Sequence, residues 1–284
     1  MLWIEKTERG DLVMKLKKML ALGLAMFTMA AFAAGCGNDA DKDKAAATEL
    51  PKKIVIGLDD NFPPMGFRDD KGEIVGFDID LAKEVAKRAG MEVEFKPIDW
   101  DSKEAELKSK RIDALWNGLS LTPEREKNIL FSTPYVQDKQ IIAVRADSPI
   151  QSKDDLKGKI VGTQQGSSVE AAVEKDAQER GFKEVKKYGD FVNAFMDLEL
   201  GRIDALVVDG IVGQFTMTQK PGVFRLANGD YGAETMGVGF RLDDKALQAR
   251  INEVLKQVMN DGTADKIAEK WFGNSNLLNK DAFK

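Results

Sequence analysis

Apolar residues recur at helical spacing in four segments of the chain, and each segment predicts an amphipathic helix. The first segment ends before Gly90, which suits a helix C-terminus, and the second follows Asp190, which is a good N-terminal cap. The third and longest segment follows a pair of aspartates. The four predicted helices cover residues 80–89, 190–201, 247–258 and 263–271.

Short runs rich in β-branched residues predict strands, and two of these runs are repeated. Lys53–Val55 is echoed by Lys159–Val161, and Arg111–Leu115 is echoed by Arg202–Leu206. In each half we expect the order strand, loop, helix, strand. The first half is longer, so residues 59–76, rich in Pro, Gly and Asp, are predicted to form an extra loop. Strands that alternate with helices predict an α/β fold with largely parallel sheets, and the repeat predicts two lobes.

Two further apolar runs, Gln140–Val144 and Met236–Phe240, bracket the second half. If the chain leaves the first lobe on one run and returns on the other, they are the two crossover strands of a hinge. The C-terminal helices then pack on the first lobe, and a ligand cleft lies between the lobes. The predicted lobes are residues 51–143 with 237–284, and residues 144–236.

The N-terminal part of the chain predicts targeting rather than fold. Met14–Lys18 is basic, Met19–Ala34 is uncharged, and small residues precede Cys36, which is the pattern of a signal peptide over residues 1–35. The apolar run is shorter than the roughly 20 residues of a membrane-spanning helix; a buried helix is the alternative. Because residues 1–13 carry three acidic side chains, we expect translation to start at Met14. Polar residues 36–50 predict a flexible tether.

The composition excludes several kinds of chemistry. Among 284 residues there is no His, and Cys36 is the only Cys. Catalysis by Ser-His-Asp or Cys-His groups, His-ligated zinc and disulfides within the chain are therefore excluded. The net charge of −5 and the lack of a basic patch argue against nucleic acid as a partner. We expect neither a cofactor nor a metal.

Polar loops follow four of the predicted strands, at the end where α/β sheets bind ligands. They offer small residues, hydrogen-bond donors and carboxylates, and none contains a nucleophile beside a base. The loops are Asp59–Pro64, Asn117–Ser120, Gln164–Ser168 and Val208–Gly210.

Arg125 and Asp209 are the charged candidates for ligand binding. Thr122 and Pro123 suit the start of a helix, which places Arg125 in a first turn whose free N–H groups favour an anion. An Arg side chain can also hold a carboxylate with two parallel bonds. The alternative is a surface ion pair with a neighbouring Glu of the same helix. Asp209 ends an apolar strand, where it is either a helix cap or a ligand group.

Four longer motifs resemble those of the polar amino-acid-binding proteins of ABC importers, the bacterial extracellular solute-binding protein family 3. They are Val75–Leu81, Ser120–Arg125, Phe131–Tyr135 and Lys270–Gly273. The resemblance runs from about Leu50 to Phe272. It implies a type II periplasmic-binding-protein-like fold and a monomeric, non-enzymatic protein. Such a protein closes on a free polar amino acid and delivers it to a membrane permease and its ATPase.

The four residues that end at Cys36, Ala33–Cys36, resemble the lipobox of bacterial lipoproteins. They depart from that motif at Ala33, where Leu is usual. The resemblance implies a lipid (palmitate) anchor at Cys36. It places the protein outside the cytoplasm, on the cell surface or in the periplasm.

The family resemblance implies which residues hold the charged ends of the amino acid. Arg125 would bind the α-carboxylate, helped by Ser120 and by the N–H groups of Ser167–Ser168. Asp209 would bind the α-ammonium group, beside the carbonyl of Gly118.

The resemblance also implies how the ligand's side chain is held. Phe62 and Trp100 would sandwich it, although from sequence alone such residues are more often part of the core. Asp59 would reach its polar end, which favours lysine, arginine or histidine, whereas Gln164 equally suits glutamine. Asn117 lies where the family varies. The same fold also resembles cyclohexadienyl dehydratases acting on prephenate or arogenate, which is the alternative function.

Overall fold

The structure is a computed structural model that describes residues 50–284. The predicted signal peptide, the start at Met14, the lipidation of Cys36 and the tether up to residue 49 lie outside the described residues. Between residues 50 and 284, no helix combines the length and the apolar character needed to cross a membrane.

The first five-stranded sheet is built from both ends of the described chain. β1 (Lys53–Leu58) lies between β5 (Glu92–Pro97) and β6 (Ala114–Leu115) and is parallel to both. Next to β6, β13 (Gly239–Phe240) runs antiparallel and pairs with the edge strand β7 (Leu130–Phe131).

The second five-stranded sheet has the same plan. β9 (Ile160–Gln164) lies between β10 (Glu184–Tyr188) and β11 (Ala205–Asp209), parallel to both. β8 (Val136–Arg145) is antiparallel to β11, and β12 (Phe224–Met236) is antiparallel to β8 at the edge. The α/β fold class predicted from the sequence is confirmed, since both sheets have a parallel core with helices in the connections.

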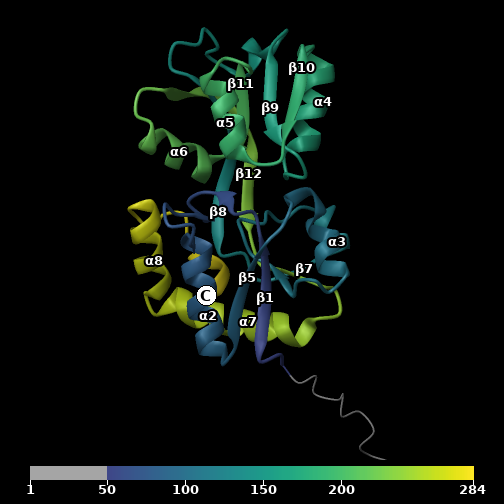
Figure 1. Cartoon of the computed structure of the whole chain (residues 1–284), viewed down its shortest axis with the longest axis vertical. Coiled ribbons are helices and arrows are strands. Elements are labelled where there is room, and N and C mark those ends of the chain that lie inside the picture. Colours follow the sequence, from purple (N-terminus) through teal and green to yellow (C-terminus); the bar gives the residue numbers. More distant parts are fainter. Residues whose placement is uncertain (1–49) are drawn as a thin grey trace, which may run out of the picture. The chain divides into compact units, whose positions relative to one another are not determined.

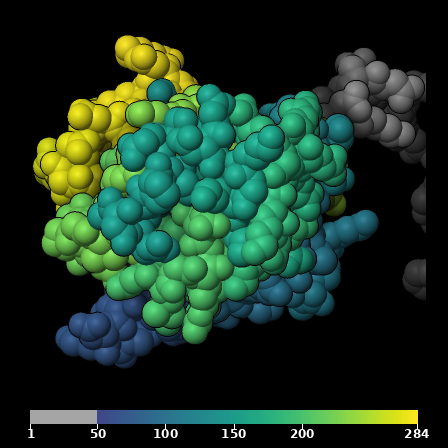
Figure 2. All heavy atoms as spheres, turned by 90° about the horizontal axis from the view of Figure 1, so that it is seen from above, coloured from purple at the N-terminus to yellow at the C-terminus, as the bar shows by residue number. Residues whose placement is uncertain are grey.

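Seven helices accompany the two sheets in the described residues. Figure 1 labels them, and Figure 2, seen from above, shows the teal and green residues on the near face and the yellow C-terminal residues to one side. The helices are α2 (Phe77–Ala89), α3 (Lys103–Lys108), α4 (Glu170–Arg180), α5 (Phe191–Glu199), α6 (Gly210–Gln219), α7 (Lys245–Asn260) and α8 (Thr263–Phe272).

The four helices predicted from periodicity are present at α2, α5, α7 and α8, with ends that differ by a few residues. Gly90 ends α2 in the left-handed conformation that glycine allows, with φ of 77°. Asp190 caps α5 by accepting a hydrogen bond from the Asn193 N–H. The large apolar residues of α7 are buried, including Leu247 and Leu255.

The repeated strings mark equivalent places in the two sheets, but the predicted order within each half was incomplete. Each half is strand, helix, strand, helix, strand, and the prediction lacked the strands β5 and β10 and one helix per half. The Val55 N–H donates to Asp113 Oδ2 at 3.0 Å, and the Ile160 N–H donates to Asp204 Oδ2 at 2.8 Å. The first string is therefore displaced by one residue, because Val55 matches Ile160 and not Val161.

The second predicted crossover strand was wrong. Met236–Phe240 is not one strand, because β12 ends at Met236 and β13 starts at Gly239. The long strands β8 and β12 pair side by side and run from the second sheet toward the first (Figure 1). The division into lobes at residues 143/144 and 236/237 stays a prediction.

The predicted loop of residues 59–76 contains a small antiparallel sheet of three strands. These are β2 (Asn61–Phe62), β3 (Gly66–Arg68) and β4 (Ile74–Val75). Gly76, with φ of 144°, joins this sheet to α2, and a Cβ there would lie 2.2 Å from the Met65 carbonyl oxygen. Only glycine permits so close an approach of the two backbone segments.

We predict that Asp204→Ala lowers the free energy of unfolding by about 1–3 kcal/mol, because it leaves the Ile160 N–H at the start of β9 without its acceptor. Urea denaturation measures this change. The control is Asp147→Ala, since the Asp147 side chain is 82% exposed and its loss should cost little. Equal effects of the two substitutions would contradict the role assigned to Asp204.

Candidate functional site

The ends of β1 and β9 bring two predicted site residues together. Asp59 follows β1 and Gln164 ends β9, at equivalent places in the two sheets. Gln164 Nε2 donates to Asp59 Oδ2 at 2.7 Å, and both side chains are buried. Residues that are 105 positions apart in the chain thus form a direct contact between the loops of the two sheets.

A small cavity beside this contact is lined by nine of the eleven predicted ligand-binding residues. Its volume is about 10 Å³, so the lining groups are almost in contact with one another. Asp59 and Asn117 do not line it, but they adjoin it: the Asp59 N–H donates to Asn117 Oδ1 at 3.1 Å. The lining residues are Phe62, Trp100, Gly118, Ser120, Arg125, Gln164, Ser167, Ser168 and Asp209.

Arg125 is buried, with 6% of its surface exposed. Its Nη1 donates to the Ser120 carbonyl and its Nη2 to the Gly166 carbonyl, both at 2.9 Å. The predicted helix is only a 3₁₀ turn over Arg125–Lys127, although Thr122 Oγ1 does accept from the Arg125 N–H at 3.2 Å. Burial lowers the pKa of Arg125. Within the described residues no carboxylate lies within ion-pair distance of it, so the surface pair considered as an alternative is absent there.

Asp209 is buried where β11 ends and α6 begins. It makes no side-chain capping bond to α6, which removes the helix-cap alternative. Instead its Oδ1 accepts from Gln140 Nε2 at 3.0 Å. Burial, followed by the charges of Glu234 and Asp138, raises the pKa of Asp209 well above its usual value.

Sequence reasoning missed the groups around Asp209. Carboxylate oxygens of Asp138, Asp209 and Glu234 lie within 4.8 Å of one another. Gln140 Nε2 also donates to Glu234 Oε1 at 2.8 Å, and Ser168 Oγ donates to Glu234 Oε2 at 2.9 Å. The only signal in the sequence was polar residues at the ends of apolar strands. These carboxylates give this end of the cavity an affinity for positive charge.

A second missed residue, Asp78, fixes the loop that carries Gly118. Asp78 is fully buried in α2; it accepts from the Tyr135 hydroxyl at 2.8 Å and from the Gly118 N–H at 2.7 Å. Gly118 has φ of 59°, and a Cβ there would lie 2.8 Å from the Phe62 ring. Asp78 therefore holds the Gly118 backbone through its N–H group, and the ring of Phe62 lies close against the same glycine.

The two Ser residues of the Gln164–Ser168 turn are only partly free to bind an anion. The Ser167 N–H donates to the Gln164 carbonyl at 3.3 Å, which is a long bond within the turn. The Ser168 hydroxyl is engaged by Glu234. The turn lies close to Arg125, because Arg125 Nη2 donates to the Gly166 carbonyl. Arg125, Ser167 and Ser168 can therefore converge on one carboxylate.

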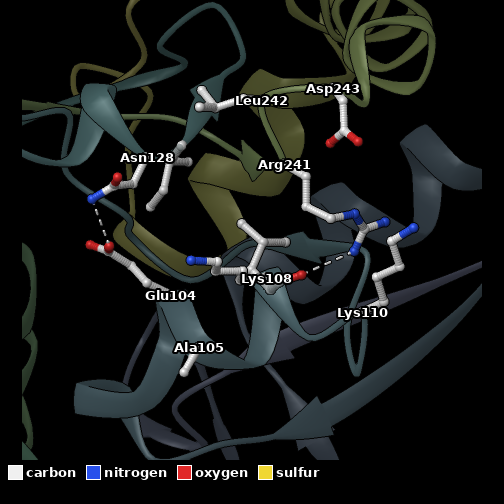
Figure 3. A pocket seen from close by; sticks show the side chains of 10 residues that line it. Glu104, Ala105, Lys108, Lys110, Asn128, Arg241, Leu242 and Asp243 are labelled. Carbon is white, nitrogen blue, oxygen red and sulfur yellow. Dashed lines mark hydrogen bonds between the residues drawn. The ribbon is translucent and has the colours of Figure 1, made fainter.

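Larger hollows lie elsewhere and gather none of the predicted site residues. One, of about 610 Å³, is shown in Figure 3, where Lys108, Lys110 and Arg241 lie beside Glu104 and Asp243. Another, of about 690 Å³, lies between α6 and α8. The chemistry of the small cavity, and not its size, makes it the candidate site.

Two sheets of the same plan, with opposite charges gathered where their strand ends meet, define a two-lobed binding protein of the type II periplasmic kind. The chain belongs to the bacterial extracellular solute-binding proteins, family 3, whose model matches residues 54–274. The fold and the family predicted from the sequence motifs are both confirmed.

Several relatives are binding proteins for amino acids. The lysine/arginine/ornithine-binding periplasmic protein of Escherichia coli K12 is 37% identical over 232 residues, covering 78% of this chain and 88% of its own. The L-cystine-binding protein of the same strain is 30% identical over 264 residues, covering 92% and 98%.

Solved structures of amino-acid-binding proteins are also similar to this chain. A substrate-binding protein of an ABC uptake transporter from Streptococcus pneumoniae, with bound histidine, is 36% identical with a TM-score of 0.76, covering 80% of this chain and 94% of its own. An ancestral arginine-binding protein bound to arginine is 42% identical with a TM-score of 0.75, covering 79% and 100%.

We predict that the protein without ligand loses stability between pH 5 and pH 7.5. Burial is the main cause that raises the pKa of Asp78 to about 7, and the partners of this carboxyl, Tyr135 and Gly118, lie in the same predicted lobe, so it stays buried when the lobes part. Over this interval Asp78 holds a proton in the native state that the unfolded chain has released. It therefore lowers the free energy of unfolding by up to about 1.4 kcal/mol per pH unit until the pH passes its native pKa. Urea denaturation at the two pH values checks this, and a higher stability at pH 7.5 would contradict it.

Proposed function

We propose that the protein binds one free polar amino acid and delivers it to the permease of an ABC importer. The observation that carries this proposal is the pair of buried, opposite charges at one cavity, Arg125 and Asp209, in a chain that belongs to family 3. We further propose that Arg125 holds the α-carboxylate and Asp209 the α-ammonium group.

The charge balance of the cavity supports this assignment. A zwitterion presents one negative and one positive end, and a buried site must match both or pay a large desolvation penalty. Arg125 donates to two neutral carbonyl oxygens, so its positive charge stays available for a carboxylate. At the other end, Asp209 lies beside Glu234, and a positive charge there relieves the repulsion between their carboxylates.

The arrangement also supports ligand-dependent closure. We place the lobes at residues 51–143 with 237–284, and at 144–236, with Arg125 in the first lobe and Asp209 in the second. A cavity of about 10 Å³ admits an amino acid only after the lobes separate. Because each lobe supplies one charged contact, the closed form gains ligand interactions that the open form lacks.

For the ligand's side chain we propose a cationic group in preference to glutamine. The part of the site proposed to meet the polar end of the ligand's side chain offers hydrogen-bond acceptors. Asp59 is buried there, and it already accepts from the Asn61 N–H at 2.9 Å and from Gln164. Asp60 and Asp190 add negative charge nearby. Relatives named for lysine, arginine, ornithine and histidine support this choice, while an ancestral relative solved with glutamine keeps glutamine in the test panel.

We also propose that the protein binds without catalysis and acts as a monomer. Arg125 is the one cation that lines the cavity within the described residues, whereas a dicarboxylate such as prephenate calls for more than one. The relatives described above are binding proteins, which supports the same reading.

For localisation we propose a lipoprotein outside the cytoplasm. Cleavage before Cys36 and lipidation of its sulfur would anchor the chain through residues 36–50, on the cell surface or in the periplasm. The motif Ala33–Cys36 supports this proposal. Mass spectrometry of the mature protein tests it, since an unmodified Cys36 would contradict it.

We predict that Arg125→Ala abolishes amino-acid binding in calorimetry while the circular dichroism spectrum is unchanged. Loss of a buried, bidentate contact to a carboxylate should reduce affinity by a factor of about 100 or more. Lys127→Ala in the same turn is the matched control, because Lys127 is exposed. Binding by Arg125→Ala with the affinity of the natural protein would refute the assignment.

We predict that Asp59→Asn weakens arginine, lysine and histidine much more than glutamine. The substitution removes the counter-charge but keeps the hydrogen-bonding shape, so a neutral side chain should lose little. For the natural protein, affinity for arginine should fall as the pH drops through about 6, where Asp59 takes up a proton. Titration of the four amino acids into both proteins decides this, and an equal loss for all four would argue against a cationic ligand.

A further inference from the structure

Lys103 is a buried cation that the proposed ligand contacts do not use. It opens α3, and only 4% of its surface is exposed, the lowest value for any lysine between residues 50 and 284. Its Nζ donates to the Trp100 carbonyl at 3.1 Å and to the Gly166 carbonyl at 2.8 Å. Nζ also lies 5.3 Å from the centre of the Trp100 ring. Within the described residues it forms no ion pair.

The Gly166 carbonyl is a meeting point between the two halves of the protein. It accepts from Lys103 and also from Arg125 Nη2. The turn around it lies close against the first half, because a Cβ on Gly166 would come within 3.0 Å of the Asp101 Cα. Gln165 Nε2 adds a bond to Asp101 Oδ2 at 3.0 Å.

Lys103 therefore contacts both parts of the candidate site without lining its cavity. On one side it holds Trp100, which is proposed to cover the ligand's side chain. On the other it holds the turn whose next residues, Ser167–Ser168, are proposed to meet the ligand's carboxylate.

We propose that Lys103 is a positioning residue that fastens the closed lobes through the Gly166 carbonyl and so sets how long the ligand stays bound. This proposal rests on the proposed function. A buried ammonium group needs hydrogen-bond acceptors to offset the loss of its water, and in the closed protein two carbonyl groups supply them. When the lobes part, the Gly166 contact is lost and Lys103 must find water in its place.

The ligand strengthens this fastening through Arg125. Burial, and after it the repulsion from Arg125, which shares the Gly166 carbonyl oxygen, lowers the pKa of Lys103 to about 8. Glu104, Asp101 and Glu170 oppose the shift from their own positions. A ligand carboxylate held by Arg125 neutralises the neighbouring charge, so the contact between Lys103 and Gly166 becomes more favourable when the site is occupied.

The test is Lys103→Met, which keeps most of the apolar stem of the side chain but removes the donor. Stopped-flow fluorescence with arginine, lysine, histidine and glutamine gives the association and dissociation rates. For each amino acid that the natural protein binds, the dissociation rate should rise about 10-fold, as expected for one lost charge-assisted hydrogen bond. The association rate should stay within about twofold, because it reflects entry into the open protein.

Lys108→Met is the control, since it lies on the same helix and is exposed; its rates should match those of the natural protein. The melting temperature of the protein without ligand separates the roles, because Lys103→Met should leave it unchanged or raise it. An unchanged dissociation rate would overturn the proposal. So would a slower association together with a lower melting temperature, which indicates a merely structural role.

If Lys103→Met does not fold, Lys103→Gln serves in its place. The Gln side chain is one atom shorter than that of Lys, so its amide falls short of the Gly166 carbonyl. The same rise in dissociation rate is expected, and its absence has the same meaning. Failure of the natural protein to bind any of the four amino acids would count against the proposed function itself. Normal binding with an unaltered dissociation rate in the variant would count against the role of Lys103 alone.

Discussion

The organisation of this protein depends on one buried positive charge that has no carboxylate partner among the described residues. The guanidinium group of Arg125 is turned toward the small cavity and bonded to two carbonyl oxygens. Removing such a charge from water is costly unless an anion compensates it. The Gly166 carbonyl, which belongs to the loop after β9, offsets part of that cost. The site is therefore complete only when the loops of both sheets meet around a ligand.

The duplicated sheets explain why the meeting point is where it is. Equivalent strands end in equivalent loops, so Asp59 after β1 faces Gln164 at the end of β9. The same duplication brings Gly118 and Asp209 to matching places, Gly118 shortly after β6 and Asp209 at the end of β11. Opposite charges thus gather from distant parts of the chain without long excursions of the backbone. Lys103 adds a contact outside the cavity, since its Nζ donates to the same Gly166 carbonyl that accepts from Arg125.

Much of the fold could be predicted because its signals are local. The caps at Gly90 and Asp190 and the repeated strings fix helices and strands within a few residues. The strands β5 and β10 were missed because each is a short edge strand with few apolar residues. In β10 the adjacent Lys186 and Lys187 also interrupt the alternation of polar and apolar residues that marks a strand. For the site, the strand-end loops identified residues that line one cavity. Asp78, Lys103 and Glu234 were not identified, since each acts through partners far away in the sequence, such as Tyr135 and Gly166. Only the folded chain shows that Asp78 and Lys103 are buried and that Glu234 is half-buried.

The most direct test of the charge clamp removes one charge from the ligand and leaves the protein intact. Calorimetry compares L-arginine with agmatine, which has the same guanidinium and amine but no carboxylate. If Arg125 holds the α-carboxylate, arginine binds with a dissociation constant of about 1 μM or less, and agmatine binds at least about 100-fold more weakly. Equal affinity for the two compounds would contradict the account, because the buried charge of Arg125 would then have no part in binding.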